Sequence, residues 1–473
     1  MRNYTQFYID GKWVAPVSPK TAEVINPATE EVSGTISLGS TADVDLAVAA
    51  ARRAFASWST TSVKERLELL RAIQAEYAVR MQELGEAVSE EMGAPLSLGC
   101  GFHVGLGAGH LQTAIEVLEN FKFEEQRGNT IILKEPIGVC GLITPWNWPL
   151  NQVTVKVFPA LATGCTSVLK PPQLAPYSAQ ILAEIMHKAG TPAGVFNMVQ
   201  GQGSVIGAAL SKHADVDMIS FTGSEQVGVQ ITKDAADTVK RVGLELGGKS
   251  AWVILDDADM VANVTAATAG MMVNAGQTCS AGSRLLVPAA RLAKAVEAAK
   301  AGAATVTVGD PNSDVGMGPV VSKAQWNIVQ DYIQTGIDEG AQLIAGGLGR
   351  PEGLNKGYYV KPTVFVTTND AVIAREEIFG PVLVLIAYDD IDQAIAIAND
   401  SVFGLGGYVS GQDKDAAVAI ARRMRTGAIW INGGFDFHAP FGGYKRSGNG
   451  REWGEHGFAE YVEVKAIMVG GAA

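Results

Sequence analysis

The middle of the chain alternates short apolar segments with stretches of helix length, and this pattern constrains the fold more than any other feature. The apolar segments cover residues 139–144, 167–170, 195–199, 218–221 and 251–255. Short, continuously apolar strands are typical of parallel sheets that are covered by helices on both faces. The alternation therefore predicts a doubly wound α/β fold.

A second alternating series begins near Gly247 and continues to about Gly442. Because 473 residues exceed what one hydrophobic core usually holds, we expect two or three domains. Ahead of both series, Asp10-Gly11 predicts a hairpin, and apolar spacing predicts helices over 43–58 and 67–84.

Further strands are expected outside the two series. Gly128-Asn129 predicts a turn between two strands, and the first of these contains Phe121 and Phe123. Residues 458–469 predict a last strand.

Charge and composition argue against several classes of function. Lys and Arg number 37 against 49 Asp and Glu, and this acidic balance argues against nucleic acid and anionic membranes as partners. No apolar run approaches the roughly 18 residues of a membrane helix, and the N-terminus lacks a secretory apolar run, so we expect a cytoplasmic protein. The four cysteines form no CxxC pair and the histidines no HExxH pattern, so neither a disulfide framework nor a metal site is expected.

Cys279 is a candidate nucleophile. A lone cysteine among small residues is usually a core residue, but here Gln277, Thr278 and Ser280 are polar. Gly276 permits a close approach of the backbone, and a reactive thiolate fits such a loop.

Glu245 is a candidate general base. It stands between Leu244 and Leu246 and is followed by Gly247-Gly248. It is either a surface residue at a strand end or a base whose pKa is raised in a partly apolar pocket. A covalent acyl intermediate on a thiol needs such a base to activate the water that releases the product.

Asn147 is a candidate oxyanion donor. It lies in a rigid turn of two prolines and two tryptophans, 145–149, directly after an expected strand. An asparagine there is either a turn residue or a donor to a developing oxyanion, and the aromatic density favours the donor.

Three strand ends carry candidate cofactor residues. Lys170 ends one strand, Gly201 and Gly203 follow the next, and Gly223-Ser224 follows the one after. Open α/β sheets bind ligands at the carboxyl ends of their strands, where a Gly-Ser turn can bind a pyrophosphate.

Taken in order, these segments resemble the aldehyde dehydrogenase family over nearly the whole chain. The matching stretches are Pro145-Trp146-Asn147-Trp148-Pro149, Phe221-Thr222-Gly223-Ser224, Leu244-Glu245-Leu246-Gly247-Gly248-Lys249, Gly276-Gln277-Thr278-Cys279, Glu376-Glu377-Ile378-Phe379-Gly380-Pro381-Val382 and Pro440-Phe441-Gly442-Gly443-Tyr444-Lys445.

The resemblance implies oxidation of an aldehyde to a carboxylic acid with NAD or NADP through a cysteine thiohemiacetal and thioester. It implies that Cys279 is the nucleophile, that the Asn147 amide and the Cys279 N–H form the oxyanion hole, and that Glu245 is the base. Lys156 and Glu452 are expected to form a proton exit route.

The resemblance also implies a cofactor site. Lys170 is expected to bind the adenine ribose, Ser224 the pyrophosphate and Glu377 the nicotinamide ribose, while Phe379 packs on the nicotinamide. The other expected cofactor residues are Thr144, Trp146, Gln173, Gly203, Gly223 and Leu246. Many NAD-preferring members carry Glu where this chain has Gln173, and a neutral amide does not repel a 2′-phosphate. We therefore expect NAD as the cofactor with NADP also accepted.

The aldehyde is expected to be uncharged, either aromatic or of medium aliphatic length. The residues expected to line its tunnel mix aromatic and polar groups and include no Arg or Lys: Trp148, Asn151, Gln152, Val155, Phe435, Phe437 and Phe441.

The resemblance implies an aldehyde dehydrogenase-like fold with a Rossmann-like cofactor domain over 1–120 and 139–247 and an α/β catalytic domain over 248–447. Residues 121–138 and 448–473 are expected to form an oligomerisation arm, so a homodimer or homotetramer is expected.

Three alternatives stay open. A CoA-acylating semialdehyde dehydrogenase of the same fold typically lacks Glu at the base position. A non-catalytic member would have lost Asn147, Glu245 or Cys279, and all three are present. A thiol hydrolase would need a histidine near Cys279, and the sequence points to none.

Overall fold

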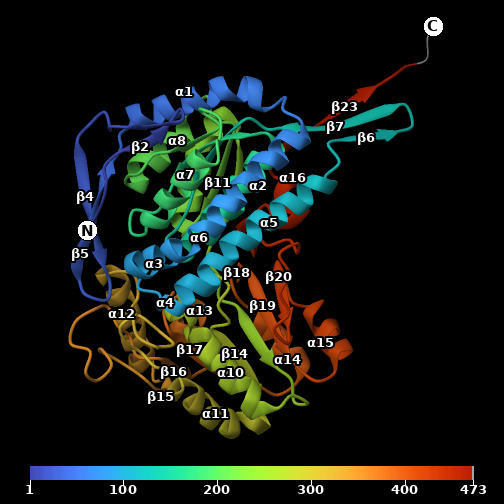
Figure 1. Ribbon diagram of the computed structural model, residues 1–473. Coiled ribbons are helices and arrows are strands. Elements are labelled where there is room, and N and C mark those ends of the chain that lie inside the picture. The colour runs from blue at the N-terminus through green and yellow to red at the C-terminus, as the bar shows by residue number, and fades with distance from the viewer. Residues whose placement is uncertain (471–473) are drawn as a thin grey trace.

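The computed structural model describes residues 1–470, and two large sheets dominate it (Figure 1). The five central strands of the first sheet run parallel, which confirms the expected α/β class. The sheet has the order β22 (Gly448–Asn449), β12 (Arg241–Glu245), β11 (Met218–Thr222), β8 (Val139–Ile143), β9 (Thr166–Lys170), β10 (Phe196–Met198), β2 (Phe7–Ile9) and β3 (Lys12–Val14).

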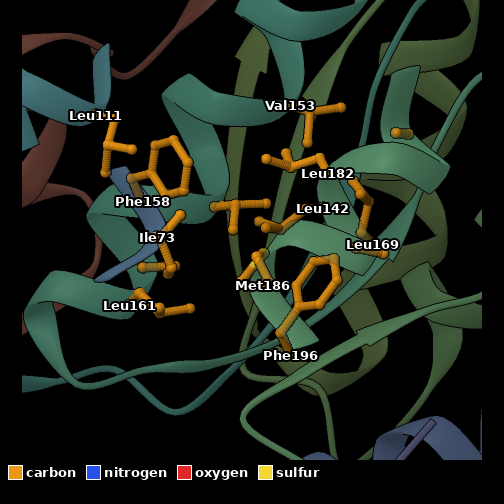
Figure 2. Close-up of a cluster of buried hydrophobic side chains, with 14 of the residues drawn as sticks. Ile73, Leu111, Leu142, Val153, Phe158, Leu161, Leu169, Leu182, Met186 and Phe196 are labelled. Atoms are coloured by element: carbon orange, nitrogen blue, oxygen red, sulfur yellow. The ribbon is translucent and has the colours of Figure 1, made fainter. Parts of the chain in front are cut away.

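Helices cover both faces of this sheet because successive residues of a strand point to opposite sides. On β8, Val139 and Ile143 pack with helix α1 (Thr41–Trp58), whereas Leu142 faces the opposite core. That second core also holds residues of α2 (Val63–Val79), α5 (Val104–Asn120), α6 (Pro149–Thr163) and α7 (Tyr177–Lys188) (Figure 2).

The second sheet has seven strands, of which only β15 runs antiparallel to its neighbour. Its order is β15 (Gln342–Ala345), β16 (Thr363–Val366), β17 (Val382–Tyr388), β14 (Arg284–Pro288), β13 (Ala251–Ile254), β19 (Gly406–Ser410) and β20 (Ala428–Ile431). Four of the five strands expected in the middle of the chain belong to the first sheet, and the fifth is β13 of the second.

The early part of the chain follows its sequence pattern with one break. Asp10 and Gly11 have φ angles of 53° and 74° and join β2 to β3 as the expected hairpin. The helix expected over 67–84 is instead divided between α2 and α3 (Met81–Met92). Arg80 separates them with φ −108° and ψ 14°, and its guanidinium pairs with Glu83 and Glu184.

A third sheet extends from the body as an arm made of β6 (Glu124–Arg127), β7 (Thr130–Pro136) and β23 (Val462–Met468) (Figure 1). Phe121 and Phe123 lie outside the strand expected to contain them, because they pack against each other at the end of α5.

The expected C-terminal strand begins later than its pattern indicates, because Phe458 belongs to helix α16 (Gly454–Ala459) and is buried. Of the range 448–473 expected in the arm, β23 joins it, whereas β22 pairs with β12 of the first sheet. Residues 471–473 of that range lie outside the described residues. None of the helices within 1–470 combines the length and the apolar character needed to cross a membrane.

The two large sheets bring the candidate segments together. In the first sheet, β8 ends just before Asn147, and β12 ends at Glu245. β14 and β17 of the second sheet begin a few residues after Cys279 and Glu377. The site therefore lies between the carboxyl ends of one sheet and the amino ends of the other.

Candidate active site

The loop that carries Cys279 has an unusual backbone. Asn274, Ala275 and Gly276 follow the end of α10 (Met260–Met272) with φ angles of 56°, 54° and 69°, which residues other than glycine rarely adopt. A Cβ atom on Gly276 would overlap the carbonyl of Gly380. Glycine at this position therefore lets the loop lie directly against the segment that carries Glu377 and Phe379.

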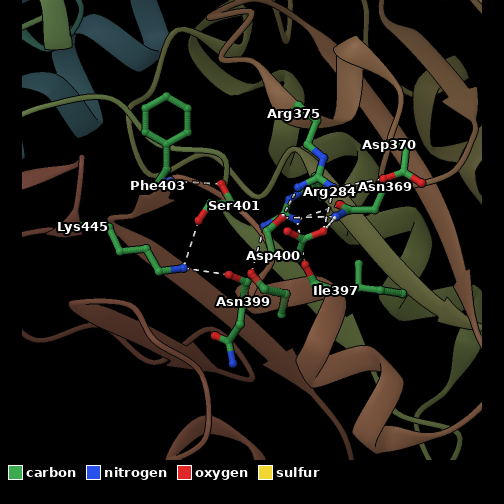
Figure 3. A network of polar contacts seen from close by, with 11 residues as sticks. Arg284, Asn369, Asp370, Arg375, Ile397, Asn399, Asp400, Ser401, Phe403 and Lys445 are labelled. Carbon is green, nitrogen blue, oxygen red and sulfur yellow. Dashed lines mark hydrogen bonds and ion pairs between the residues drawn. The ribbon is translucent and has the colours of Figure 1, made fainter.

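A buried arginine fixes the far end of the same loop. Arg284, the first residue of β14, donates from Nε to the carbonyl of Lys249 at 2.9 Å and from Nη1 to Oδ1 of Asn369 at 2.9 Å. The polar network continues to Asp400 and Arg375 (Figure 3). The strand that follows Cys279 is thus tied to the segment that follows Glu245.

Cys279 lies where two cavities meet. One cavity has a volume of about 320 Å³ and the other of about 260 Å³, and Cys279 and Thr222 line both. The larger cavity also contains the side chain of Glu245, and the smaller one that of Asn147. A sulfur in this position can react with a molecule in one cavity while a second molecule occupies the other.

Asn147 is held by the loop that carries Cys279. The side-chain Nδ2 of Asn147 donates to the main-chain carbonyl of Gln277 at 3.1 Å. The main-chain carbonyl of Asn147 accepts a bond from Nδ2 of Asn274 at 2.8 Å. An amide nitrogen carries two hydrogens, so the bond to Gln277 leaves one available. Asn147 is therefore oriented and still has a donor for a ligand near Cys279.

Glu245 is a buried carboxylate without a protein partner. Its side chain is 5% exposed, and neither oxygen accepts a hydrogen bond from another described residue. Burial, followed by the charge of Glu452, raises its pKa well above the usual carboxyl value. A carboxylate whose pKa is raised in this way is a stronger base toward water than an ordinary carboxylate.

The surroundings of Cys279 favour the protonated form of its thiol. Burial raises the pKa of its thiol to about 12, and the charges of Glu377 and Glu245 add to this effect. The neighbouring backbone N–H of Ser280 acts in the opposite direction and lowers this pKa. Attack by this sulfur therefore requires removal of its proton.

Lys156 and Glu452 form a buried ion pair behind the site. Lys156 has no exposed surface, and its ammonium contacts the Glu452 carboxylate and donates to the Ser220 hydroxyl at 3.0 Å. Glu452 also lines the larger cavity. The two residues expected to form a proton route are thus in contact, and one of them reaches the cavity.

The smaller cavity contains most of the expected cofactor residues: Trp146, Gly223, Ser224, Leu246, Glu377 and Phe379. Glu377 accepts a bond of 2.9 Å from the Gly248 N–H, and burial raises its pKa to about 7. The rings of Trp146 and Phe379 meet edge to face with centroids 5.5 Å apart.

The other four expected cofactor residues do not line this cavity. Thr144 is buried, and its hydroxyl has no partner among the described residues. Lys170 donates to the Pro171 carbonyl at 2.8 Å, and burial lowers its pKa to about 8. Gln173 is half-buried three residues beyond Lys170, and Gly203 begins a short π-helical turn, η2 (Gly203–Gly207).

Five of the seven expected substrate residues line the larger cavity: Trp148, Asn151, Gln152, Phe435 and Phe441. Val155 does not, because it is 3% exposed and lies inside the protein. Phe437 does not either, since its ring lies over Gly109 and meets Phe435 edge to face. The charged residues in the cavity lining are both acidic, Glu245 and Glu452.

A family model for the aldehyde dehydrogenase family matches residues 13–467. The chain belongs to the aldehyde dehydrogenase family.

Relatives of this aldehyde dehydrogenase cover nearly its whole length. A "3-succinoylsemialdehyde-pyridine dehydrogenase" from a Pseudomonas species is 53% identical over 99% of both chains. The solved structure of an aldehyde dehydrogenase C mutant from Pseudomonas syringae, in complex with NAD+ and octanal, has a TM-score of 0.97 and 51% identity, covering 98% of this chain and 96% of that one. The structure of a Mycobacterium tuberculosis aldehyde dehydrogenase complexed with NAD+ has a TM-score of 0.96 and 40% identity. It covers 99% of this chain and 98% of that one.

Sequence reasoning missed several residues that line the two cavities of this aldehyde dehydrogenase. Thr222 and Gly247 adjoin residues that it singled out, so their motifs held a signal. Gln325 of α12 (Lys323–Asp338) had no such signal in the sequence, and neither did the aromatic residues of the second sheet. Their neighbours in space are distant in sequence. The missed residues include Phe102, Leu106, Thr222, Gly247, Trp252, Gln325, Tyr408, Trp430 and Trp453.

Proposed function

We propose that this aldehyde dehydrogenase oxidises an uncharged aromatic or medium-chain aliphatic aldehyde to its carboxylic acid with NAD. The observation that carries the proposal is the position of Cys279 at the junction of two cavities, one rich in aromatic side chains and one containing Glu377 and Ser224. Two relatives support it by their names, one for a pyridine-bearing semialdehyde and one crystallised with NAD+ and octanal.

The smaller cavity fits a nicotinamide cofactor. The hydroxyl of Thr222 is buried at the boundary of the two cavities and has no partner within residues 1–470. Gly223 and Ser224 precede helix α9 (Glu225–Ala235), whose free N–H groups favour a pyrophosphate. Glu377 offers an acceptor to ribose hydroxyls, and Trp146 and Phe379 offer apolar surface. The cofactor supplies the hydride acceptor when it is bound.

The residues around Cys279 account for formation of a covalent adduct. The thiolate of Cys279, which release of the product regenerates, adds to the carbonyl carbon of the aldehyde and gives a thiohemiacetal whose oxygen carries negative charge. The free hydrogen of the Asn147 amide and the Cys279 N–H stabilise that oxygen. Loss of hydride from the tetrahedral carbon leaves a thioester on Cys279.

Glu245 and the ion pair behind it account for product release. Glu245 takes a proton from water, and the hydroxide that forms attacks the thioester and frees the carboxylic acid and the Cys279 thiolate. Glu452 lines the same cavity, and Lys156 contacts it, so the pair offers this proton a route away from Glu245.

Steady-state rates with NAD and three aldehydes test the proposed substrate class. We expect kcat/KM for hexanal and benzaldehyde to exceed that for succinic semialdehyde by about tenfold or more, because an anion would enter a cavity whose charged groups are both acidic. A preference for succinic semialdehyde would contradict the proposal. Added CoA should neither accelerate turnover nor appear in the product.

We further propose the cofactor and catalytic domains stated from the sequence, with the arm of β6, β7 and β23 as the contact between subunits. The arm sheet leaves one edge of β6 and one edge of β23 unpaired, and β23 exposes Val464, Ile467 and Met468. Exposed edges of this kind are sites where another chain can pair. Light scattering at micromolar concentration should give a dimer or a tetramer, and a monomer would contradict this assignment.

A further inference from the structure

Three aromatic rings form a stack beside the nucleophile loop. Trp252 of β13, Tyr408 of β19 and Trp430 of β20 are register neighbours on adjacent parallel strands. The ring centroids of Trp252 and Tyr408 lie 4.8 Å apart with planes inclined by 22°, and those of Tyr408 and Trp430 lie 4.9 Å apart at 20°. The ring of Tyr408 is therefore confined between two indoles.

The stack lies directly against the loop that carries the nucleophile. A Cβ on Gly282 would come within 2.9 Å of a Trp252 ring atom and 3.2 Å of a Tyr408 ring atom. Trp252 is itself fixed, because its indole N–H donates to the Ser410 hydroxyl at 2.9 Å. Side chains of the second sheet thus form a rigid support under residues 280–282.

Tyr408 makes one polar contact with this loop, and it is adjacent to the nucleophile. Its hydroxyl donates to the carbonyl of Ser280 at 2.9 Å. Burial raises the pKa of Tyr408, so the hydroxyl keeps its proton throughout the working pH range of an enzyme. The N–H of the same Ser280 lies next to the Cys279 sulfur and lowers the pKa of its thiol.

We propose that Tyr408 is a positioning residue that holds the Ser280 main chain, and with it the Ser280 N–H, in place beside the Cys279 sulfur. The inference rests on the proposed role of Cys279 as the nucleophile. The stacked rings set the direction of the hydroxyl, the hydroxyl fixes the Ser280 carbonyl, and the fixed residue presents its N–H to the thiolate. A hydrogen bond to the anion favours the reactive form of the cysteine.

The test compares two tyrosine-to-phenylalanine variants. Tyr408→Phe keeps the stacked ring and removes the hydroxyl. Tyr388→Phe is the matched control, because the Tyr388 hydroxyl also donates to a backbone carbonyl of the second sheet, that of Ile254 at 2.7 Å, in a buried setting away from Cys279. Both variants lose one bond of the same kind, so thermal unfolding should reveal a similar loss of stability in each.

Alkylation of Cys279 by iodoacetamide separates a positioning role from a structural one. The rate is followed from about pH 7 to about pH 10 without cofactor, and peptide mass spectrometry distinguishes Cys279 from the partly exposed Cys100. We expect Tyr408→Phe to react about three- to tenfold more slowly at each pH below the thiol pKa, because a smaller fraction is thiolate. Tyr388→Phe should react at the wild-type rate.

Two results would overturn the proposal. In one, Tyr408→Phe follows the wild-type alkylation profile, and in the other, both variants shift equally. Because alkylation needs no turnover, the result does not depend on which aldehyde is oxidised. A separate experiment tests the proposed role of Cys279 as the nucleophile. If Cys279→Ala still oxidised aldehydes at the full rate, that role would be disproved.

Discussion

The indole N–H of Trp148 donates a hydrogen bond of 2.9 Å to the hydroxyl of Thr278. This bond joins the residue after Asn147 to the residue before Cys279. Asn147 also donates to the carbonyl of Gln277, so two consecutive residues of one segment bind two consecutive residues of the other. Asn147 and Cys279, the proposed oxyanion donor and nucleophile, are therefore positioned together, although their loops adjoin strands of different sheets.

Removing the hydrogen bond between Trp148 and Thr278 should slow the chemical step. We expect Trp148→Phe to lower kcat by about three- to tenfold, which corresponds to roughly 1 kcal/mol of lost alignment, with KM for NAD unchanged. Trp326→Phe is the control, since its indole bonds to the Tyr359 carbonyl at 2.9 Å away from Cys279. Equal losses of kcat in the two variants would argue against a role for the Trp148 bond.

Breaking the buried ion pair should destabilise the protein. Glu452→Gln leaves the ammonium of Lys156 without its carboxylate in a site with no solvent exposure. We expect a loss of about 3 kcal/mol in the free energy of unfolding, measured with urea, together with slower turnover. Glu463→Gln removes a more exposed partner from Arg241 and should cost less than about 1 kcal/mol. Similar losses in both variants would show that the pair adds nothing beyond a surface contact.

Cofactor binding should weaken in mild acid. Burial raises the pKa of Glu377 to about 7, so its carboxyl is ionised above that pH and protonated below it. Only the ionised form accepts hydrogen bonds from two ribose hydroxyls at once, so the Kd for NAD should rise as pH falls from about 8 to about 6. Fluorescence titration of Glu377→Gln should give a Kd for NAD that hardly changes with pH. At the higher pH this Kd should be larger than that of the wild type. An equal pH dependence in both proteins would assign the effect to another group.

The sequence predicted the parts of the site that depend on local structure. Asn147 follows the expected apolar strand β8, and adjacent proline and glycine residues encode the turns beside Asn147 and Glu245. Glu245 itself ends β12, which was not among the strands expected from the sequence. The aromatic wall of the larger cavity could not be predicted in this way. Trp252 and Tyr408 become neighbours only because β13 lies beside β19, and this strand order has no local signal.

Two expected substrate residues illustrate the same limit. Val155 lies one helical turn after Asn151, yet it is inside the protein because helix α6 is covered on nearly every side. Phe437 lies in the expected loop, but its ring occupies the space that Gly109 of α5 leaves free. Helix packing decides both positions, and a single segment does not encode it.

We expect the preference between NAD and NADP to depend on Gln173. We expect kcat/KM for NADP to lie within about a thousandfold of that for NAD, a difference of roughly 4 kcal/mol, because the neutral amide does not repel a 2′-phosphate. Gln173→Glu should lower the NADP value by a further tenfold or so through charge repulsion and leave the NAD value within about threefold. A wild-type NADP efficiency more than about a thousandfold below that for NAD would reject dual use.

The proposed division of labour between Cys279 and Glu245 is tested most directly by rapid mixing of Glu245→Gln with NAD and octanal. We predict one equivalent of reduced cofactor per subunit, followed by almost no steady-state turnover, and mass spectrometry should find an octanoyl thioester on Cys279. Absence of both the burst and the acyl group would contradict this account, because Glu245 would then be required before the thioester forms.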